Sequence, residues 1–382
     1  MTTSSNNMLV NDFGIEHAHW RNWVGNQSCV RAARGAPRSE DELCALIAEA
    51  SAKGMNVRVA GSGHSFTPVA LTNGLHLTLS QMKGVKSVDR AKRRVTASAG
   101  TTINELVKVL KSEGLSLLNQ GDIDSQAIAG AFTTGTHGTG AGLPILADCI
   151  VGMKLVQPDG SILVVDETTP DLLLAGRVSL GTLGAISEMT LQATDSYRLK
   201  ERIWREDFEV AMEMHDDLAA NHRHFSFFWC PYEESRHLYC LPDTAATSKS
   251  GRTADVCEMK VMDITEDAPF ESTFEKVAYS SDVYPIEYIP NFHELEYAVP
   301  RQHGKDAVRA VRKIMLEDFP EARFPIEYRF TAGDEAWMSP CHKQDSVTVS
   351  VSGEPGTDYW AYLRAVDKIL RGYGARPHWG KM

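Results

Sequence analysis

The chain has 382 residues, which at the ~150 residues typical of one domain suggests two or three domains. Hydrophobic residues make up 43% of the sequence and charged residues 23%. This composition is typical of soluble globular proteins, and it excludes a disordered chain, a collagen and a small disulfide-stapled scaffold. The net charge of −11 repels phosphate backbones and anionic lipid head groups, so nucleic acid and membranes are not expected partners.

Targeting and metal-binding patterns are not found in the sequence. No apolar run approaches the ~18 residues of a membrane span, and the N-terminus lacks the basic and apolar segments of a secretion signal. These features favour a cytoplasmic location. The seven cysteines are scattered without a C-x-x-C pair and are expected to be reduced thiols. Histidines and cysteines between His222 and Cys240 match no zinc pattern, so no metal is expected.

The first half of the chain alternates helix and strand patterns. Ser39 caps a helical pattern over residues 39–53, and a second helical pattern covers residues 102–113. A Pro158-Asp159-Gly160 turn between two apolar runs predicts a β-hairpin over residues 150–166. The remaining strand-like runs in this half are residues 56–61, 75–80, 93–100 and 179–194.

The composition changes after Ser196, which predicts a domain boundary. The following part is richer in aromatic residues and contains a loop of small polar residues, 242–253. Amphipathic helices are expected over residues 306–319 and 358–374.

The segment VRVAGSGHSFTP, residues 57–68, is a strand that runs directly into a turn with glycines at 61 and 63. Glycines at such a turn allow successive backbone N–H groups to face an anion such as a pyrophosphate. The third glycine of the Rossmann fingerprint would fall on Phe66, which disfavours a nicotinamide cofactor. Considered alone, the turn is equally compatible with an ordinary loop at the end of a strand.

A second glycine-rich segment covers residues 129–142, with glycines at 130, 135, 138, 140 and 142. Its lack of side-chain bulk indicates that something approaches this backbone closely. Two such turns, separated by strands, fit an extended dinucleotide better than a mononucleotide.

These motifs together resemble a known family. VRVAGSGHSFTP, TGTHGTG, KLVQPDG, LGTLGAISEMTL, FPIEYRF and RPHWGKM, in this order between Trp20 and Met382, are similar to the FAD-linked aldonolactone and alditol oxidases of the vanillyl-alcohol-oxidase superfamily. The resemblance implies an α+β flavoprotein of the PCMH type with two domains. The FAD-binding domain is expected over residues 1–195, an antiparallel-sheet cap that binds substrate over 196–359, and a C-terminal segment returning to the flavin over 360–382.

The resemblance also implies that His64 is bonded covalently to the flavin of FAD; the alternative is a loop histidine that hydrogen-bonds a phosphate. No cysteine lies in the TGTHGTG loop, so a second tether is not expected. His137 in that loop is expected to fix the turn by donating to backbone carbonyls. The cofactor-binding residues that the resemblance implies, besides His64, are Gly61, Ser62, Gly63, Ser65, Gly121, Gly130, Thr134, Gly135, His137, Gly138, Gly140 and Ile186.

In FPIEYRF, residues two apart on a strand share a face, so Glu327 and Arg329 are expected side by side, with Tyr328 packed on the other face. A solvated ion pair would explain them equally well. The resemblance implies more: Arg329 and Lys381 would stabilise negative charge, and Glu327 would orient or deprotonate the substrate hydroxyl. The sequence does not decide which of the three catalytic candidates, Glu327, Arg329 or Lys381, accepts the proton.

The resemblance implies two substrate contacts. Asp122 stands where some alditol-oxidising relatives have a serine, which weakens a direct transfer of polyol specificity. Ser350, with Ser352 on the same strand face, is the second candidate.

Gly121 matches a family position where a small residue leaves O2 a route to the reduced flavin, and it is otherwise a turn glycine. We therefore expect oxidation of a CH–OH group of a sugar-derived lactone, of the L-gulono-1,4-lactone or D-arabinono-1,4-lactone type, with O2 as acceptor and H2O2 as product. The alternatives are an alditol or xylitol oxidase, a lactone dehydrogenase with another acceptor, and a non-catalytic flavin- or carbohydrate-binding protein. Relatives continue past the HWGK motif, so a short variant or a truncated chain is expected. The sequence leaves the oligomeric state open.

Overall fold

The computed structural model describes residues 19–241, 248 and 250–382. The N-terminal segment, for which no secretion signal is expected, therefore lies outside the described residues. Much of the predicted loop 242–253 lies outside them as well. The chain divides into two compact units. The first unit comprises Met1–Glu113, Asp124–Thr134 and Cys149–Ala193, and the second comprises Gly114–Ile123, Gly135–Asp148 and Thr194–Met382. The main division at 193/194 lies close to the expected boundary at 195, but two short segments of the first half belong to the second unit.

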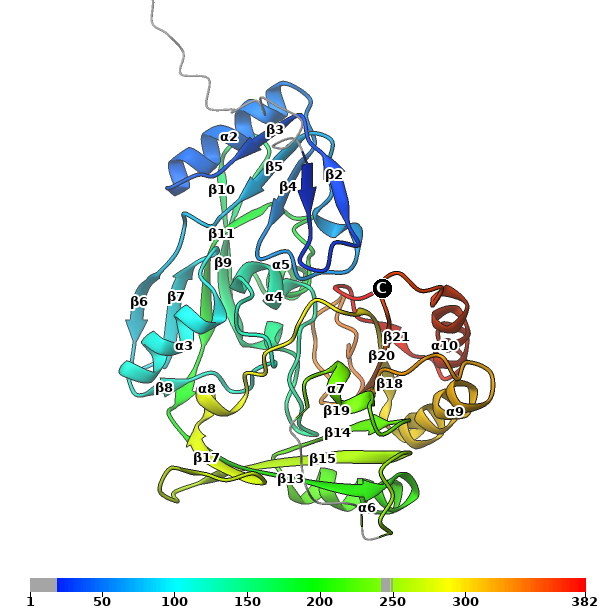
Figure 1. Ribbon diagram of the computed structural model, residues 1–382. Coiled ribbons are helices and arrows are strands. Elements are labelled where there is room, and N and C mark those ends of the chain that lie inside the picture. The colour runs from blue at the N-terminus through cyan, green and yellow to red at the C-terminus, as the bar shows by residue number, and fades with distance from the viewer. Residues whose placement is uncertain (1–18, 242–247, 249) are drawn as a thin grey trace, which may run out of the picture. The chain divides into compact units, whose positions relative to one another are not determined.

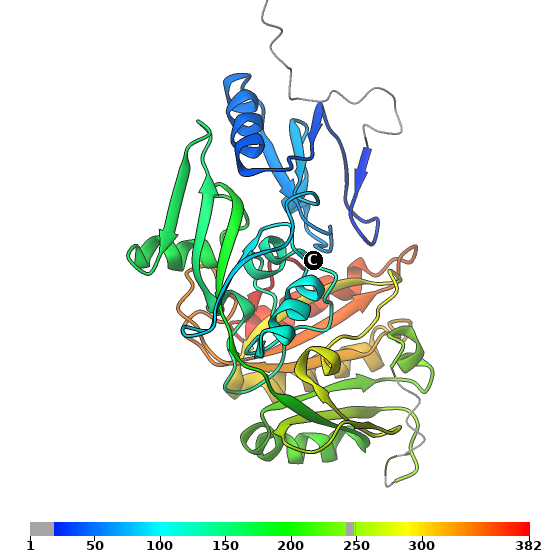
Figure 2. The same ribbon diagram turned by 90° about the vertical axis from the view of Figure 1, so that its left-hand side faces the viewer.

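The described part of the first unit contains a parallel three-stranded sheet and an antiparallel five-stranded sheet. Figure 1 shows α2 beside the parallel sheet, and Figure 2 shows β9, β10 and β11 side by side. The parallel sheet has the order β3 (Ala33–Gly35), β5 (Leu75–Thr78) and β4 (Val57–Ala60). The antiparallel sheet has the order β10 (Ile162–Asp166), β9 (Ile150–Val156), β11 (Ala185–Gln192), β7 (Arg94–Ser98) and β6 (Val85–Asp89). The other elements are β1 (His19–Arg21), β2 (Ser28–Val30), α2 (Glu40–Ala52), α3 (Ile103–Ser112), α4 (Ile128–Thr133) and α5 (Pro170–Arg177).

Local signals explain where these elements begin. The Ser39 side chain accepts a hydrogen bond from the Glu42 N–H and so caps α2. Thr102 and Glu105 form a complete capping box at the start of α3. The predicted hairpin is confirmed, since β9 and β10 pair antiparallel around Gly160, whose φ of 82° suits glycine.

The second unit is built on an antiparallel sheet of nine strands among the described residues. Its order is β16 (Phe270–Glu271), β17 (Glu275–Tyr279), β13 (Arg198–Asp207), β15 (Val256–Thr265), β14 (His224–Cys230), β19 (Ile326–Thr331), β20 (Ser346–Gly353), β18 (His293–Pro300) and β21 (Arg376–Pro377). The predicted helices over 306–319 and 358–374 are confirmed as α9 (Gly304–Glu317) and α10 (Trp360–Gly372), which lie side by side in Figure 1. The remaining elements are α6 (Phe208–Asn221), α7 (Ser235–Leu238), α8 (Ser280–Val283) and a short ladder of β8 (Leu115–Ser116) with β12 (Thr194–Asp195).

The two faces of this sheet differ in polarity. Apolar side chains of β18, β19 and β20 alternate toward one face, where α6, α9 and α10 complete one hydrophobic core. Tyr328 is fully buried there, and its hydroxyl hydrogen-bonds His215 on α6 at 2.8 Å. On the opposite face the register places Glu327, Ser350 and Glu296 in one row across the three strands. The period-2 prediction for FPIEYRF is therefore confirmed.

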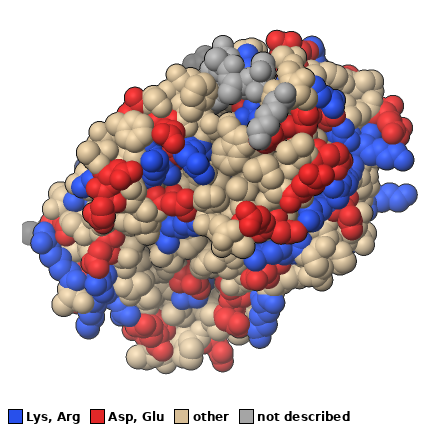
Figure 3. Space-filling model, turned by 90° about the horizontal axis from the view of Figure 1, so that it is seen from below, with Lys and Arg blue, Asp and Glu red and all other residues tan. Residues whose placement is uncertain are grey.

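Charged side chains of both signs are interspersed on the face of the molecule in Figure 3. Within the described ranges, no helix has both the length and the apolar character needed to cross a bilayer.

The glycine-rich segment 129–142 divides between the two units. Residues 129–134 include most of α4 in the first unit, whereas residues 135–142 belong to the second unit. There the Gly140 N–H donates to the Phe330 carbonyl at 2.9 Å, which adds this loop to the edge of β19. A Cβ on Gly138 would lie 2.3 Å from the Gln120 carbonyl oxygen. At Gly135, Gly138 and Gly140 the predicted close approach is thus made by the chain itself.

We predict that Gly138→Ala destabilises the protein, because its methyl group would overlap backbone and Asn119 side-chain atoms. The expected loss is about 1–3 kcal/mol of unfolding free energy or more, as for other overpacked sites. The matched control is Gly142→Ala in the same loop, where a Cβ meets nothing within 4 Å. Urea unfolding of both variants checks this, and equal stabilities would contradict the packing assigned to Gly138.

Candidate active site

The first unit contains a cleft of about 910 Å³, near the upper end of the roughly 300–1,000 Å³ usual for ligand pockets. Three segments with glycines line it: the turn after β4, the region of α4, and the loop before β11. The cofactor residues predicted from the sequence that line this cleft are Gly61, Ser62, Gly63, His64, Ser65, Gly130, Thr134 and Ile186. The third loop, 180–185, belongs to the motif LGTLGAISEMTL, which the sequence predicts as strand material and as part of the family resemblance. Its glycines at 181 and 184 line the cleft, although they are not among the predicted cofactor-binding residues.

Two glycines of this cleft, Gly130 and Gly181, leave room for a ligand. A Cβ on Gly130 or Gly181 would meet nothing within 4 Å. Gly63 and Gly181 have φ values of 73° and 71°, a region that glycine enters without strain. The Ser62 hydroxyl donates to the Ser125 carbonyl at 2.7 Å and accepts from the Ala127 N–H at 3.1 Å, which fixes the turn. The cleft therefore fits a long ligand lying against bare backbone, as FAD requires.

His64 is oriented by its neighbours. The Trp23 ring stacks on the imidazole with a centroid separation of 4.9 Å and an interplanar angle of 28°. Trp23 is itself held by its backbone N–H, which donates to the Gly63 carbonyl at 2.8 Å. The Ser125 hydroxyl lies 3.4 Å from His64 Nε2. Neither Trp23 nor Ser125 carried a sequence signal, since they reach His64 only through the fold.

The second unit carries a cluster of buried charges on the polar face of its sheet. Arg329 donates to both Glu327 and Asp122, and the three side chains are only 13%, 11% and 15% exposed. This burial rules out the alternative of a solvated ion pair for Glu327 and Arg329. The Tyr288 hydroxyl also donates to Asp122 at 3.2 Å. Asp122 is thus already engaged within the protein, and its role as a substrate contact stays a prediction.

Lys381 joins the same cluster through Glu294. Its ammonium donates to one oxygen of Glu294, and the Ser350 hydroxyl donates to the other. Glu294 was not predicted from the sequence, although Glu294 and Glu296 stand two apart in the buried strand β18. This is the same period-2 signal that identified Glu327 and Arg329.

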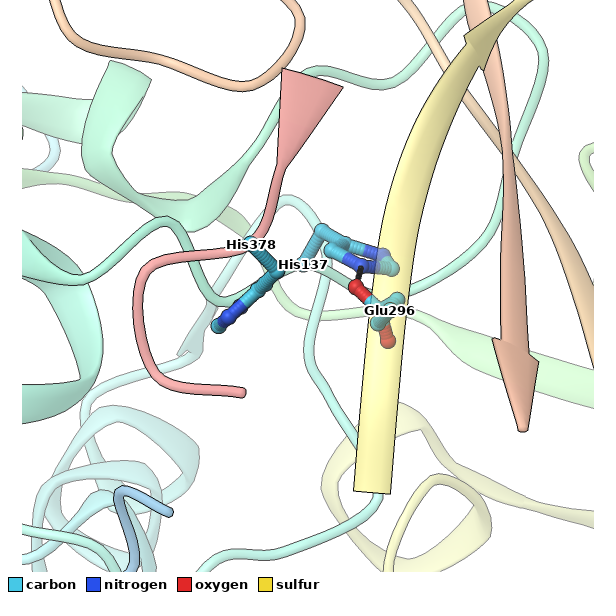
Figure 4. A group of neighbouring side chains, drawn as sticks. All are labelled: His137, Glu296 and His378. Carbon is cyan, nitrogen blue, oxygen red and sulfur yellow. Dashed lines mark hydrogen bonds and ion pairs between the residues drawn. The ribbon is translucent and has the colours of Figure 1, made fainter. Parts of the chain in front are cut away.

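Glu296 binds His137, which the sequence analysis predicted to fix the turn and to be among the cofactor-binding residues. His137 Nε2 lies 2.8 Å from Glu296, while Nδ1 lies 2.8 Å from the Gly138 carbonyl oxygen, as predicted for a residue that fixes the turn (Figure 4). His378 lies beside this pair, with its ring centroid 5.9 Å from that of His137. His137, Glu296 and His378 each offer one atom that could bind a metal ion, and these three atoms lie within 4.8 Å of one another. Because His137 and Glu296 already bond each other, we interpret the group as an ion pair rather than a metal site.

The pKa values follow from burial and from neighbouring charges. Burial raises the pKa of Glu327 to about 7; Arg329 opposes this, while Asp122, Glu294 and Glu296 add to it. Burial lowers the pKa of His378 to about 3, so His378 is neutral. For His137, burial acts to lower the pKa, but the Glu296 carboxylate outweighs it and raises the pKa above its usual value.

Four carboxylates therefore share this site with three cationic groups. The carboxylates belong to Asp122, Glu294, Glu296 and Glu327, and the cationic groups to Arg329, Lys381 and His137. Protonation of Glu327 would balance the charges, in keeping with its raised pKa. The site offers a carboxyl group that can gain or lose a proton near neutral pH, beside fixed positive charges.

The other predicted residues lie nearby in the second unit. Gly121 is buried, and a Cβ there would lie 3.2 Å from the His137 carbonyl oxygen. Gly135, Gly138 and Gly140 lie in a loop that belongs to the second unit. Like Gly121 and His137, they are not among the residues lining the cleft of the first unit. Their roles toward a cofactor stay predictions.

We predict that Glu327→Gln changes the pH dependence of stability. With a folded pKa of about 7 and an unfolded value of about 4.3, wild-type Glu327 stabilises the fold at low pH and loses this contribution as pH rises through 7. Glutamine does not titrate, so the stability of Glu327→Gln relative to wild type should increase by on the order of 2 kcal/mol between pH 5 and pH 8. Urea unfolding at several pH values measures the difference, and a flat difference would contradict the raised pKa.

Comparison with known proteins places this geometry in a family. Residues 32–166 match the family described as FAD binding domain, and residues 256–382 match the family described as D-arabinono-1,4-lactone oxidase. An L-gulono-1,4-lactone dehydrogenase of Mycobacterium tuberculosis is 33% identical over 385 residues, covering 95% of this chain and 89% of the relative. An L-gulonolactone oxidase of Mus musculus is 28% identical over 399 residues, covering 96% and 90%.

Solved structures share the fold. A solvent-stable cholesterol oxidase has a TM-score of 0.79 at 16% identity, covering 98% of this chain and 88% of that chain. A cholesterol oxidase from B. sterolicum has a TM-score of 0.78 at 15% identity, covering 100% and 88%. The predicted α+β flavoprotein fold of the PCMH type, with an FAD-binding domain and an antiparallel-sheet domain, is confirmed. The chain therefore belongs to the FAD-dependent aldonolactone oxidoreductases of the vanillyl-alcohol-oxidase superfamily, enzymes that act on a CH–OH group of an aldonolactone.

Proposed function

We propose that this enzyme oxidises a CH–OH group of an aldonolactone of the L-gulono-1,4-lactone or D-arabinono-1,4-lactone type and uses O2 as electron acceptor, releasing H2O2. The observation that carries the proposal is the buried cluster of Glu327, Arg329 and Asp122, which combines a carboxyl group of pKa about 7 with a fixed guanidinium. The matched family and the similar enzymes indicate these two lactones.

The first unit would hold FAD in its glycine-lined cleft, with the diphosphate against the turn 61–65 and the region around Gly130. When bound, FAD supplies the hydride acceptor for the oxidation and passes the two electrons on to the final acceptor. We assign His64 the covalent link to the flavin. The stacked Trp23 and the nearby Ser125 support this assignment, because they hold the imidazole in one orientation at the cleft.

The second unit would supply the residues that handle substrate protons and charge. Glu327 can accept the hydroxyl proton when ionised, and its pKa near 7 suits a general base at neutral pH. Arg329 and Lys381 would provide preorganised positive charge for the negative charge that develops during oxidation. The Ser350 hydroxyl, on the same strand face as Glu294 and Glu296, would contact the substrate.

Two observations bear on the electron acceptor. Glycine at position 121, where the family resemblance implies that a small residue leaves O2 a route to the reduced flavin, favours O2 as the acceptor. The relative that is 33% identical is named a dehydrogenase, which favours another acceptor as the second candidate. A polyol substrate is the second candidate for specificity, because the hydroxyl-binding groups of the cluster suit an alditol as well.

We predict that His64→Ala abolishes covalent attachment of the flavin without preventing folding. Acid precipitation of the wild-type protein should leave yellow flavin in the pellet, whereas the variant should release flavin to the supernatant. Ser125→Ala is the control and should keep the flavin in the pellet, because its hydroxyl only contacts the imidazole. Complete release of flavin from the wild-type protein would contradict the link through His64.

We predict that a lactone of the L-gulono or D-arabinono type reduces the flavin anaerobically with a higher kcat/KM than xylitol or another alditol, and that admitting air reoxidises it with formation of H2O2. Higher kcat/KM values for alditols would reverse the substrate assignment. Slow reoxidation in air with good turnover on artificial acceptors would make the enzyme a dehydrogenase. The matched variant Gly121→Ala should slow reoxidation roughly tenfold, equivalent to about 1.4 kcal/mol, with little change in the rate of flavin reduction.

A further inference from the structure

We propose that Glu294 is a positioning residue that keeps Lys381 charged and holds its ammonium, together with the Ser350 hydroxyl, in the substrate site. This inference rests on the proposed function, in which Lys381 and Ser350 face the substrate. Glu294 lies on β18, and both of its carboxylate oxygens are engaged, one by Lys381 and the other by Ser350. A carboxylate bound in this way has no rotational freedom left, so it fixes both partners.

The same residue also holds the backbone next to Lys381. The Met382 N–H donates to the Glu294 carbonyl at 2.8 Å, and the His378 N–H donates to the Glu296 carbonyl at 3.0 Å. The Lys381 N–H closes a turn onto the His378 carbonyl at 3.1 Å. The segment from β21 to Met382 is therefore aligned along β18 by its main chain, and Glu294 then sets where the lysine side chain ends.

The charges around Lys381 show why its contact with Glu294 matters. Burial acts to lower the pKa of Lys381, but Glu294, Glu296 and Glu327 outweigh it and raise the pKa above its usual value. Glu296 is already paired with His137, and Glu327 with Arg329. Glu294 is thus the carboxylate that binds the ammonium directly, with a side chain only 7% exposed. Removing one partner of a buried ion pair leaves the other charge without compensation.

A purely structural role for Glu294 is the alternative, in which it merely anchors the C-terminal segment. The two roles differ in how Glu294 and Lys381 combine. A residue that acts through Lys381 has no further effect once the lysine side chain is removed, whereas an independent anchor adds its own effect. A double-mutant cycle therefore separates them.

The experiment compares wild type, Glu294→Gln, Lys381→Met and the double variant as flavin-loaded proteins. We expect each single variant to lower kcat/KM for the lactone roughly 10- to 100-fold, and the double variant to match Lys381→Met within about threefold. The control is Glu258→Gln on β15, which removes a largely buried carboxylate paired with Arg205 on β13. It should leave kcat/KM close to that of wild type.

A second readout does not depend on turnover. Competitive acetylation at increasing pH, followed by mass spectrometry of the Lys381 peptide, reports the ionisation and accessibility of this one amine. In Glu294→Gln the lysine should react at lower pH than in wild type, because the neighbouring negative charge is lost; Glu258→Gln should leave its reactivity unchanged. Glu294→Asp retains the negative charge, so the pH at which its Lys381 reacts should lie between the values for wild type and Glu294→Gln. This variant keeps the test available if Glu294→Gln does not fold.

Two results would overturn the inference. One is that the losses of kcat/KM in Glu294→Gln and Lys381→Met multiply in the double variant. The other is that Lys381 is labelled identically in wild type and Glu294→Gln. Failure of the proposed function would look different: wild type itself would not be reduced by lactones or alditols. In that case the labelling profile still decides whether Glu294 controls Lys381.

Discussion

Burial of charge on one face of a sheet is the constraint on which the second unit depends. Its carboxylates and cations are removed from water, and such groups persist only when they are paired and hydrogen-bonded. The pairs are Arg329 with Glu327 and Asp122, Lys381 with Glu294, and His137 with Glu296. Except for Arg329 with Glu327, which are neighbours on β19, each pair joins segments far apart in the sequence. The cost of separating any pair therefore ties the loops 114–123 and 135–148 and the C-terminal segment to the same sheet.

The opposite face makes this arrangement possible. There β18, β19 and β20 send apolar residues into the core formed with α6, α9 and α10. That packing holds the strands rigidly, so their polar residues occupy fixed positions in the same row. Electrostatic catalysis requires such preorganisation, because charges that must reorient during the reaction contribute little. The same alternation along each strand thus provides both the stability of the unit and the placement of its charged groups.

The first unit achieves ligand binding by a different means. Its cleft offers backbone and glycines rather than a collection of charges, and no side-chain bulk extends from Gly130 or Gly181. Backbone N–H groups can face phosphates only where a Cβ does not intervene. This contrast agrees with the proposed function, in which the first unit would hold FAD and the second would offer titratable groups to a hydroxylated substrate.

The sequence by itself determined the features that depend on local pattern. The caps at Ser39 and Thr102, the hairpin at Gly160 and the pairing of Glu327 with Arg329 on one strand face follow from residues close together in the chain. The family motifs extended this to the FAD-binding fold. The sequence showed that glycines are positions of close approach, but it did not show what approaches them. Gly130 borders a cleft, whereas Gly138 packs against Gln120.

Only the tertiary structure decided which distant charges meet. Glu294, Glu296 and Trp23 gain their contacts through strand register and loop placement, which have no local signature. Burial likewise depends on the whole fold, so the solvated alternative for Glu327 and its pKa of about 7 could be resolved only in three dimensions. The physical reason is that helix caps, tight turns and the alternation of side chains along a strand are set by neighbours in the sequence. Desolvation and ion pairing instead depend on every segment that packs around a group.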